Sequence, residues 1–216
     1  MASAVAVERH PSCRALATTS AGVARSLGWD DGERIPVERM LDAIARIAAA
    51  VELPVTADLE AGYGDPAATA RAAWEAGAVG LNLEDRNAPL EEQCERIAAV
   101  RATVPGLVLN ARTDVFLDGS ADPDEAIARA NAYLRAGADC TFAIGLVERA
   151  TIARLARELE GPLNVLATKD SPPVAELARL GVRRISLGSG LHRASLAAAG
   201  AGAAELFERG TYGFLA

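Results

Sequence analysis

The segment PVTADLEAGYGD at residues 54–65 decides the fold, because an apolar run there ends in two acidic residues and a glycine-rich turn. Two later apolar runs end in a similar way, VGLNLED at 79–85 and LVLNARTD at 107–114. Short apolar runs bounded by polar residues and glycine are typical of buried parallel strands. The carboxyl ends of such strands meet at one rim, so the polar side chains there are predicted to converge. They are Asp58, Glu60, Glu84 and Arg112.

Three helix-to-strand junctions along the chain look alike. In each one a helical pattern ends at a glycine, and a strand-like run starts within about two residues, as in short loops between helix and strand. We therefore expect positive φ angles at Gly77, Gly137 and Gly181. The strands predicted from these patterns cover residues 14–18, 53–58, 79–84, 107–111, 139–143, 163–167 and 184–187.

Seven strands, each followed by a helix at a spacing of roughly 20 to 30 residues, suit a (β/α)8 barrel lacking one strand or an open doubly wound sheet. We favour the barrel, because no GxGxxG or GxxxxGK fingerprint occurs and polar residues follow several strands. The remaining strand is expected ahead of residue 1, since 3–10 reads as a helix with nothing before it to pack against. The prediction is one α/β domain over residues 1–216, a TIM-type barrel without its first strand.

Composition narrows the class of partner. The chain has 216 residues, half of them hydrophobic, and a net charge of -7 with its basic residues scattered, which argues against nucleic acid and anionic membrane surfaces. Apolar runs such as 196–207 are too short to cross a bilayer. Cys13, Cys94 and Cys140 lack metal-ligand spacing and fit buried thiols in a reducing compartment. We expect a cytoplasmic protein with small-molecule partners.

The acidic residues predict a divalent cation. Asp58 and Glu60 would point the same way in an ideal strand, and the glycines that follow allow a tight turn near a ligand. Carboxylate oxygens suit Mg²⁺, with Mn²⁺ as the alternative. The nonfunctional alternative is that these acids lie by chance on a solvated loop. Arg112 would bind an anionic substrate, or pair with Asp114 or Glu84.

Other reactive side chains receive weaker predictions. Tyr63 is either a polar group over the site or a cover for the barrel mouth. His10 and His192 fall in predicted helices and read as surface or packing residues. Lys169 is the chain's only lysine and follows a predicted strand, so an aldolase using a Schiff base is an alternative, although its flanking residues suit a polar turn better.

Six segments together resemble a known family: ALATTSAG (15–22), VTADLEAGYGD (55–65), GLNLEDR (80–86), LNARTDVFL (109–117), PLNVLA (162–167) and RRISLGSGLHRA (183–194). In this order and spacing they resemble the isocitrate lyase and phosphoenolpyruvate mutase superfamily. The resemblance covers nearly the whole chain and implies a magnesium-binding barrel. Such an enzyme makes or breaks a carbon–carbon or carbon–phosphorus bond of a small 2-oxo acid or phosphonate through an enolate-like species.

The resemblance also implies roles for individual residues. Asp58 would be the direct metal ligand, with Glu60 and Glu84 acting mainly through waters and Asp31 as a further acidic residue of the metal site. Arg112 would contact the substrate oxygens. The backbone amides of Thr19, Ser20 and Ala21 would anchor the substrate, and a homo-oligomer is implied.

Departures from the family pattern narrow the activity. The loop EDRNAPLEEQCERI (84–97) lacks the KxCGH motif of isocitrate and methylisocitrate lyases, and Cys94 falls on the helix after it. It also lacks the lysine and asparagine-serine pair of phosphonate mutases. The pattern fits the short-loop, carboxyvinyl-carboxyphosphonate phosphorylmutase-like branch. Because residues 1–216 match neither the family's first strand nor its terminal helix, a noncatalytic barrel retained for binding or assembly is the alternative hypothesis.

Overall fold

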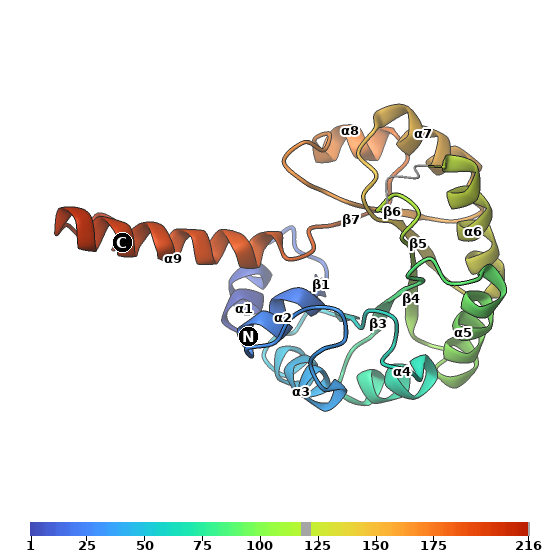
Figure 1. The fold of residues 1–216 in the computed structure, drawn as a ribbon, viewed down its shortest axis with the longest axis horizontal. Coiled ribbons are helices and arrows are strands. Elements are labelled where there is room, and N and C mark those ends of the chain that lie inside the picture. Colours follow the sequence, from blue (N-terminus) through green and yellow to red (C-terminus); the bar gives the residue numbers. More distant parts are fainter. Residues whose placement is uncertain (118–121, 216) are drawn as a thin grey trace.

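The computed structural model describes residues 1–117 and 122–215, and in that part the strands form one parallel sheet in sequence order, β1 to β7. The sheet curves into a nearly closed barrel, with the strands inside and most helices outside (Figure 1). The strands are β1 (Leu16–Ala17), β2 (Val55–Asp58), β3 (Gly80–Glu84), β4 (Val108–Thr113), β5 (Cys140–Ala143), β6 (Leu163–Leu166) and β7 (Arg184–Ser186). The helices are α1 (Ala2–Glu8), α2 (Ser20–Ser26), α3 (Val37–Ala48), α4 (Pro66–Glu75), α5 (Leu90–Thr103), α6 (Pro123–Ala136), α7 (Arg149–Glu158), α8 (Val174–Arg179) and α9 (Gly190–Arg209).

The predicted fold class and all seven predicted strands are confirmed. β4 runs two residues further than predicted and ends at Thr113, whereas β1 contains only Leu16 and Ala17. β1 is short because it pairs with β2 alone, as expected for the edge of a sheet. Arg184 Nη2 on the opposite edge strand, β7, donates to Thr56 Oγ1 on β2, the strand next to β1, at 3.0 Å.

Helix ends follow the sequence signals. Asp65 accepts hydrogen bonds from two backbone amides at the start of α4, and Pro66 occupies the first helical position. At the other ends, Gly77, Gly137 and Gly181 have φ angles of 96°, 120° and 100°. Their predicted positive φ is therefore confirmed, and it lets each helix turn directly into the next strand.

The apolar core fills the space between the strands and the helices that cover them. One cluster lies around β2 to β4 and includes Ile44, Leu83, Ile97 and Tyr133. A second lies around β5 to β7 and includes Leu155. Because both clusters hold the strands from outside, the strand ends at the rim are rigidly placed.

The two terminal helices differ from the rest. α1 ends at Glu8, so His10 lies in the bend after the helix and not within it, which corrects the prediction for that residue. α9 projects away from the barrel (Figure 1) and contains the apolar run 196–207. Among the described residues, no helix combines the length and the apolar character needed to cross a membrane.

Candidate active site

The ends of β2, β3 and β4 bring the predicted site residues together. Asp58 is the last residue of β2, Glu84 is the last of β3, and Arg112 is next to the last of β4. In the sheet register Glu84 lies directly opposite Arg112, and Asp58 lies opposite Asn82. The three side chains therefore reach one rim because the strands are parallel and in register.

Arg112 pairs with two carboxylates at once. Its Nη1 lies 2.7 Å from Glu84 Oε2 and its Nε lies 2.6 Å from Asp114 Oδ1, so both ion pairs considered from the sequence are present. Burial disfavours the charged guanidinium, but Glu84 and Asp114 outweigh it and raise the pKa of Arg112. The Nη2 atom donates to none of the described residues, so the guanidinium keeps donors for a further oxygen ligand.

Glu60 reaches the site through a turn and not through strand alternation. β2 ends two residues before it, and Glu60 has a left-handed backbone with φ 53°. Its Oε2 accepts from the Glu33 amide at 2.7 Å, and its Oε1 accepts from the Tyr63 hydroxyl at 3.3 Å. Burial, reinforced by the charges of Asp31, Glu84 and Asp58, raises the pKa of Glu60 to about 7. All four predicted metal residues therefore share one electrostatic environment.

Arg86 and Glu33 belong to the same cluster, although the sequence analysis missed both. The Arg86 guanidinium contacts Glu84 Oε1 at 2.8 Å through Nε, Glu33 Oε2 at 3.0 Å through Nη1 and Glu60 Oε2 at 3.3 Å through Nη2. Glu33 lies in the loop between α2 and α3, and its Oε1 accepts from the Tyr63 amide at 2.7 Å. One arginine thus joins the ends of two strands to a distant loop.

Backbone strain is concentrated around this cluster. Among the described residues, the non-glycine positions with positive φ are Glu33, Glu60, Tyr63, Arg86 and Asn87. Left-handed conformations are costly for such side chains and persist only where the surroundings enforce them, which is most common at functional sites. The strain and the charge therefore mark the same place.

Asp58 faces the start of α2. Its Oδ2 accepts from the Ser20 amide at 2.9 Å and from the Ser20 hydroxyl at 3.0 Å. Thr19 is the N-cap of that helix and Ala21 lies in its first turn, so the segment predicted to anchor the substrate borders the acidic rim. The Ser20 amide donates to Asp58 in this arrangement, and the anchoring role of these residues stays a prediction.

Asp85 is a third residue that the sequence analysis missed. It is fully buried, and its Oδ1 accepts from the amides of Asn87 and Asp114, each at 3.0 Å. Its Oδ2 accepts from the Tyr133 hydroxyl at 2.7 Å and lies 3.6 Å from Arg129 Nη1. Asp85 therefore ties the loop after β3 to the end of β4 behind the site.

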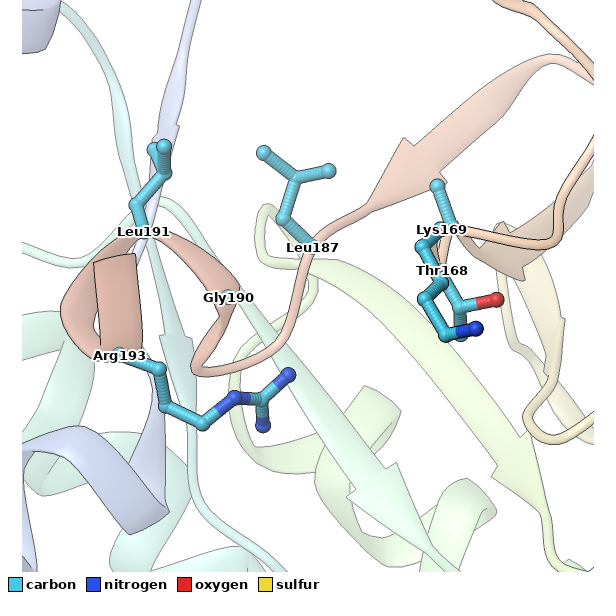
Figure 2. A pocket seen from close by; sticks show the side chains of 7 residues that line it. Thr168, Lys169, Leu187, Gly190, Leu191 and Arg193 are labelled. Atoms are coloured by element: carbon cyan, nitrogen blue, oxygen red, sulfur yellow. The ribbon is translucent and has the colours of Figure 1, made fainter. Parts of the chain in front are cut away.

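The other reactive side chains lie elsewhere. His192 is half-buried on the first turns of α9 beside Gly22, as expected for a packing residue. Lys169 is exposed and lies 3.3 Å from Asp170, in the polar turn favoured by the sequence. It borders a cavity of about 250 Å³ between the loop after β6 and the start of α9, where Lys169 and Arg193 lie on opposite sides (Figure 2). That cavity is at the ends of β6 and β7, not at the acidic rim.

Comparison with known proteins places this barrel in a family. A sequence profile of the phosphoenolpyruvate phosphomutase family matches residues 1–207. The chain belongs to this family. This match confirms the resemblance seen in the sequence. The superfamily comprises magnesium-dependent lyases and mutases that act on oxo-acid or phosphonate substrates.

Individual proteins of the superfamily are similar to this phosphomutase-family chain over most of its length. A solved structure from Burkholderia cenocepacia J2315 is 40% identical, with a TM-score of 0.88 over 98% of this chain and 81% of that one. The oxaloacetate decarboxylase of Pseudomonas aeruginosa (strain LESB58) is 32% identical over 92% of this chain and 74% of its own length. An oxaloacetate acetylhydrolase solved with oxalate is 27% identical, with a TM-score of 0.88 over 98% of this chain and 80% of that one.

The donor set of this family member suits a hard divalent cation. The acids around the rim offer only oxygen ligands, and Asp58 Oδ1 accepts no hydrogen bond from the described residues. No group of three or more histidine, cysteine, aspartate or glutamate side chains in residues 1–117 and 122–215 is arranged to hold a metal ion directly. The role of Asp58 as the direct ligand, and of the other acids as ligands through water, stays a prediction.

The raised pKa of Glu60 gives a prediction about stability. Below pH about 4.5 Glu60 is protonated in the folded and unfolded protein, and between there and pH about 7 only the unfolded protein loses the proton. Glu60 therefore lowers the free energy of unfolding as pH rises through that window, by up to about 3 kcal/mol. Urea unfolding of the wild type and of Glu60→Gln, both in EDTA at pH 5 and pH 7.5, checks this. The variant should gain stability relative to the wild type at the higher pH, and an equal difference at both pH values would contradict it.

Proposed function

We propose that this protein is a magnesium-dependent enzyme that cleaves or forms a bond next to the keto group of a small 2-oxo acid, with oxaloacetate as the first substrate to test. The observation that carries the proposal is the meeting of Asp58, Glu84 and Arg112 at adjacent strand ends. Similarity to an oxaloacetate decarboxylase and to an oxaloacetate acetylhydrolase supports this choice of substrate class.

The residues at the rim have distinct tasks in this reaction. Asp58 would hold the cation directly, Glu60 and Glu84 would hold its water ligands, and Asp31 would be a further acidic residue of the metal site. A bound Mg²⁺, or Mn²⁺ in its place, would polarise the substrate's carboxylate and keto oxygen. Arg112, fixed by Glu84 and Asp114, would donate to the oxygen on which negative charge develops in an enolate-like species.

Substrate orientation would come from the start of α2. The amides of Thr19, Ser20 and Ala21 lie in its first turn or just before it, where backbone N–H groups lack helical partners and suit an anionic group, although the Ser20 amide would have to exchange Asp58 for the substrate. Ser20 bonds to Asp58, so the segment that binds substrate is tied to the carboxylate that binds the cation. Binding of the two would therefore be coupled.

The test is cation-dependent turnover of a panel of 2-oxo acids and phosphonopyruvate. Oxaloacetate decarboxylation would be read as pyruvate by coupled NADH oxidation, after subtraction of the rate in the same Mg²⁺ buffer without protein. We expect turnover by the wild type that EDTA abolishes and that Asp58→Ala lacks. A wild-type rate equal to the buffer rate on every substrate, or an Asp58→Ala variant as fast as the wild type, would sink the proposal and favour a noncatalytic barrel.

A further inference from the structure

Arg86 makes an arrangement of contacts that the proposed reaction does not use. Each of its three guanidinium nitrogens contacts a different carboxylate, and the three carboxylates come from three separate segments. Two of these partners, Glu60 and Glu84, have only 3% and 7% of their surface exposed. A buried carboxylate is stable when charged only if a cation or hydrogen bonds compensate it.

The oxygens that Arg86 contacts are those that a bound cation or its water ligands would need. Glu84 has both oxygens engaged, Oε1 by Arg86 and Oε2 by Arg112. Glu60 Oε2 is shared between the Glu33 amide and Arg86. Glu60 and Glu84 therefore point at a guanidinium, which explains why the acids of the rim do not form a ready group of direct metal ligands among the described residues.

The position of Arg86 allows it to leave without disturbing the core. Its side chain is 41% exposed, so it reaches the cluster from the solvent side. Its backbone is held in a left-handed conformation with φ 48°, followed by Asn87 with φ 56°, and the Asn87 amide is fixed by buried Asp85. The backbone would stay in place while the long side chain swung out into water.

We propose that Arg86 is a built-in counter-ion of the acidic rim, and that a divalent cation and this guanidinium compete for Glu60 and Glu84. The inference rests on the proposed metal site, and it adds a residue that sets the site's cation affinity. Six carboxylates gather here, Asp31, Glu33, Asp58, Glu60, Glu84 and Asp114, against the guanidinium groups of Arg86 and Arg112. The divalent cation and the Arg86 guanidinium are both positive, and they therefore compete for the same carboxylate oxygens of Glu60 and Glu84.

The test measures Mn²⁺ binding by calorimetry to protein stripped with EDTA and then dialysed. Removing a positive charge a few ångströms from the site should tighten binding, and we expect Arg86→Gln to bind Mn²⁺ at least about tenfold more tightly than the wild type. Arg86→Lys keeps the charge but cannot contact three carboxylates with one ammonium, so its affinity should lie between the two. In EDTA, Arg86→Gln should melt at a lower temperature than the wild type, and saturating Mn²⁺ should raise its melting temperature more.

Arg135→Gln is the matched control, because Arg135 is an exposed arginine that pairs with Glu160 away from the rim. It should bind Mn²⁺ as the wild type does. Equal or weaker binding by both Arg86 variants, with normal binding by the wild type, would overturn the role of Arg86 and leave the proposed function standing. Absence of binding in the wild type and in both variants would overturn the metal site and this inference together. Binding by a variant alone would support the competition.

Discussion

Arg112→Lys is expected to lower kcat for the 2-oxo acid substrate by about 10²- to 10³-fold, the range measured when one donor to a developing negative charge is lost. In the wild type, Nε contacts Asp114 and Nη1 contacts Glu84, which fixes the plane of the guanidinium and leaves Nη2 for the substrate. A lysine ammonium keeps the charge but cannot hold both carboxylates and still aim a donor in a fixed direction. Steady-state kinetics with saturating Mg²⁺ measure the effect.

Arg101→Lys provides the matched control for this change. Arg101 also bridges several groups, donating to the carbonyls of Gly137 and Leu107 and pairing with Asp139, but it does so at the opposite end of the strands. Arg101→Lys keeps the positive charge but loses the several donors of the guanidinium. It should therefore lower the free energy of unfolding and leave kcat unchanged. Comparable kcat losses in both variants would show that Arg112 acts only through the stability of the barrel.

The barrel and its rim could be predicted from the sequence because both rest on local, repeating signals. Apolar runs that end in glycine or acidic residues recur along the chain, and parallel pairing forces Asp58, Glu84 and Arg112 to the same edge. Even the positive φ at Gly137 was foreseeable, since a helix that ends at Ala136 and is followed by a strand starting at Cys140 needs a residue tolerant of positive φ at its end.

Residues placed by irregular backbone could not be predicted in this way. Strand alternation predicts that Glu60 faces the rim, but the residue reaches it through a left-handed turn, so the geometric reason was wrong. Glu33 comes from a loop with no periodic pattern, and Arg86 turns back on the rim only because two successive left-handed residues redirect the chain. The sole sequence signal was the unbroken run of charge from Glu84 to Arg86 at a strand end.

Asp85→Ala is expected to lower the free energy of unfolding by about 3–5 kcal/mol, the range for breaking a buried charged network by removal of one partner. The carboxylate is fully buried, and its loss leaves the amides of Asn87 and Asp114 and the hydroxyl of Tyr133 without their acceptor. Urea unfolding in EDTA measures the change. Asp65→Ala is the control, because Asp65 is an exposed carboxylate that also accepts from two amides, and its loss should cost only about 1 kcal/mol.

A double-mutant cycle separates the network from simple loss of volume. Tyr133→Phe removes one hydrogen bond to the Asp85 carboxylate and should cost about 2 kcal/mol, as for hydrogen bonds to charged groups. In the Asp85→Ala background the same change should cost much less, because the hydroxyl no longer has that acceptor. Additive costs would mean that Asp85 and Tyr133 stabilise the barrel independently, and the loop that carries Arg86 would then owe its position to other contacts.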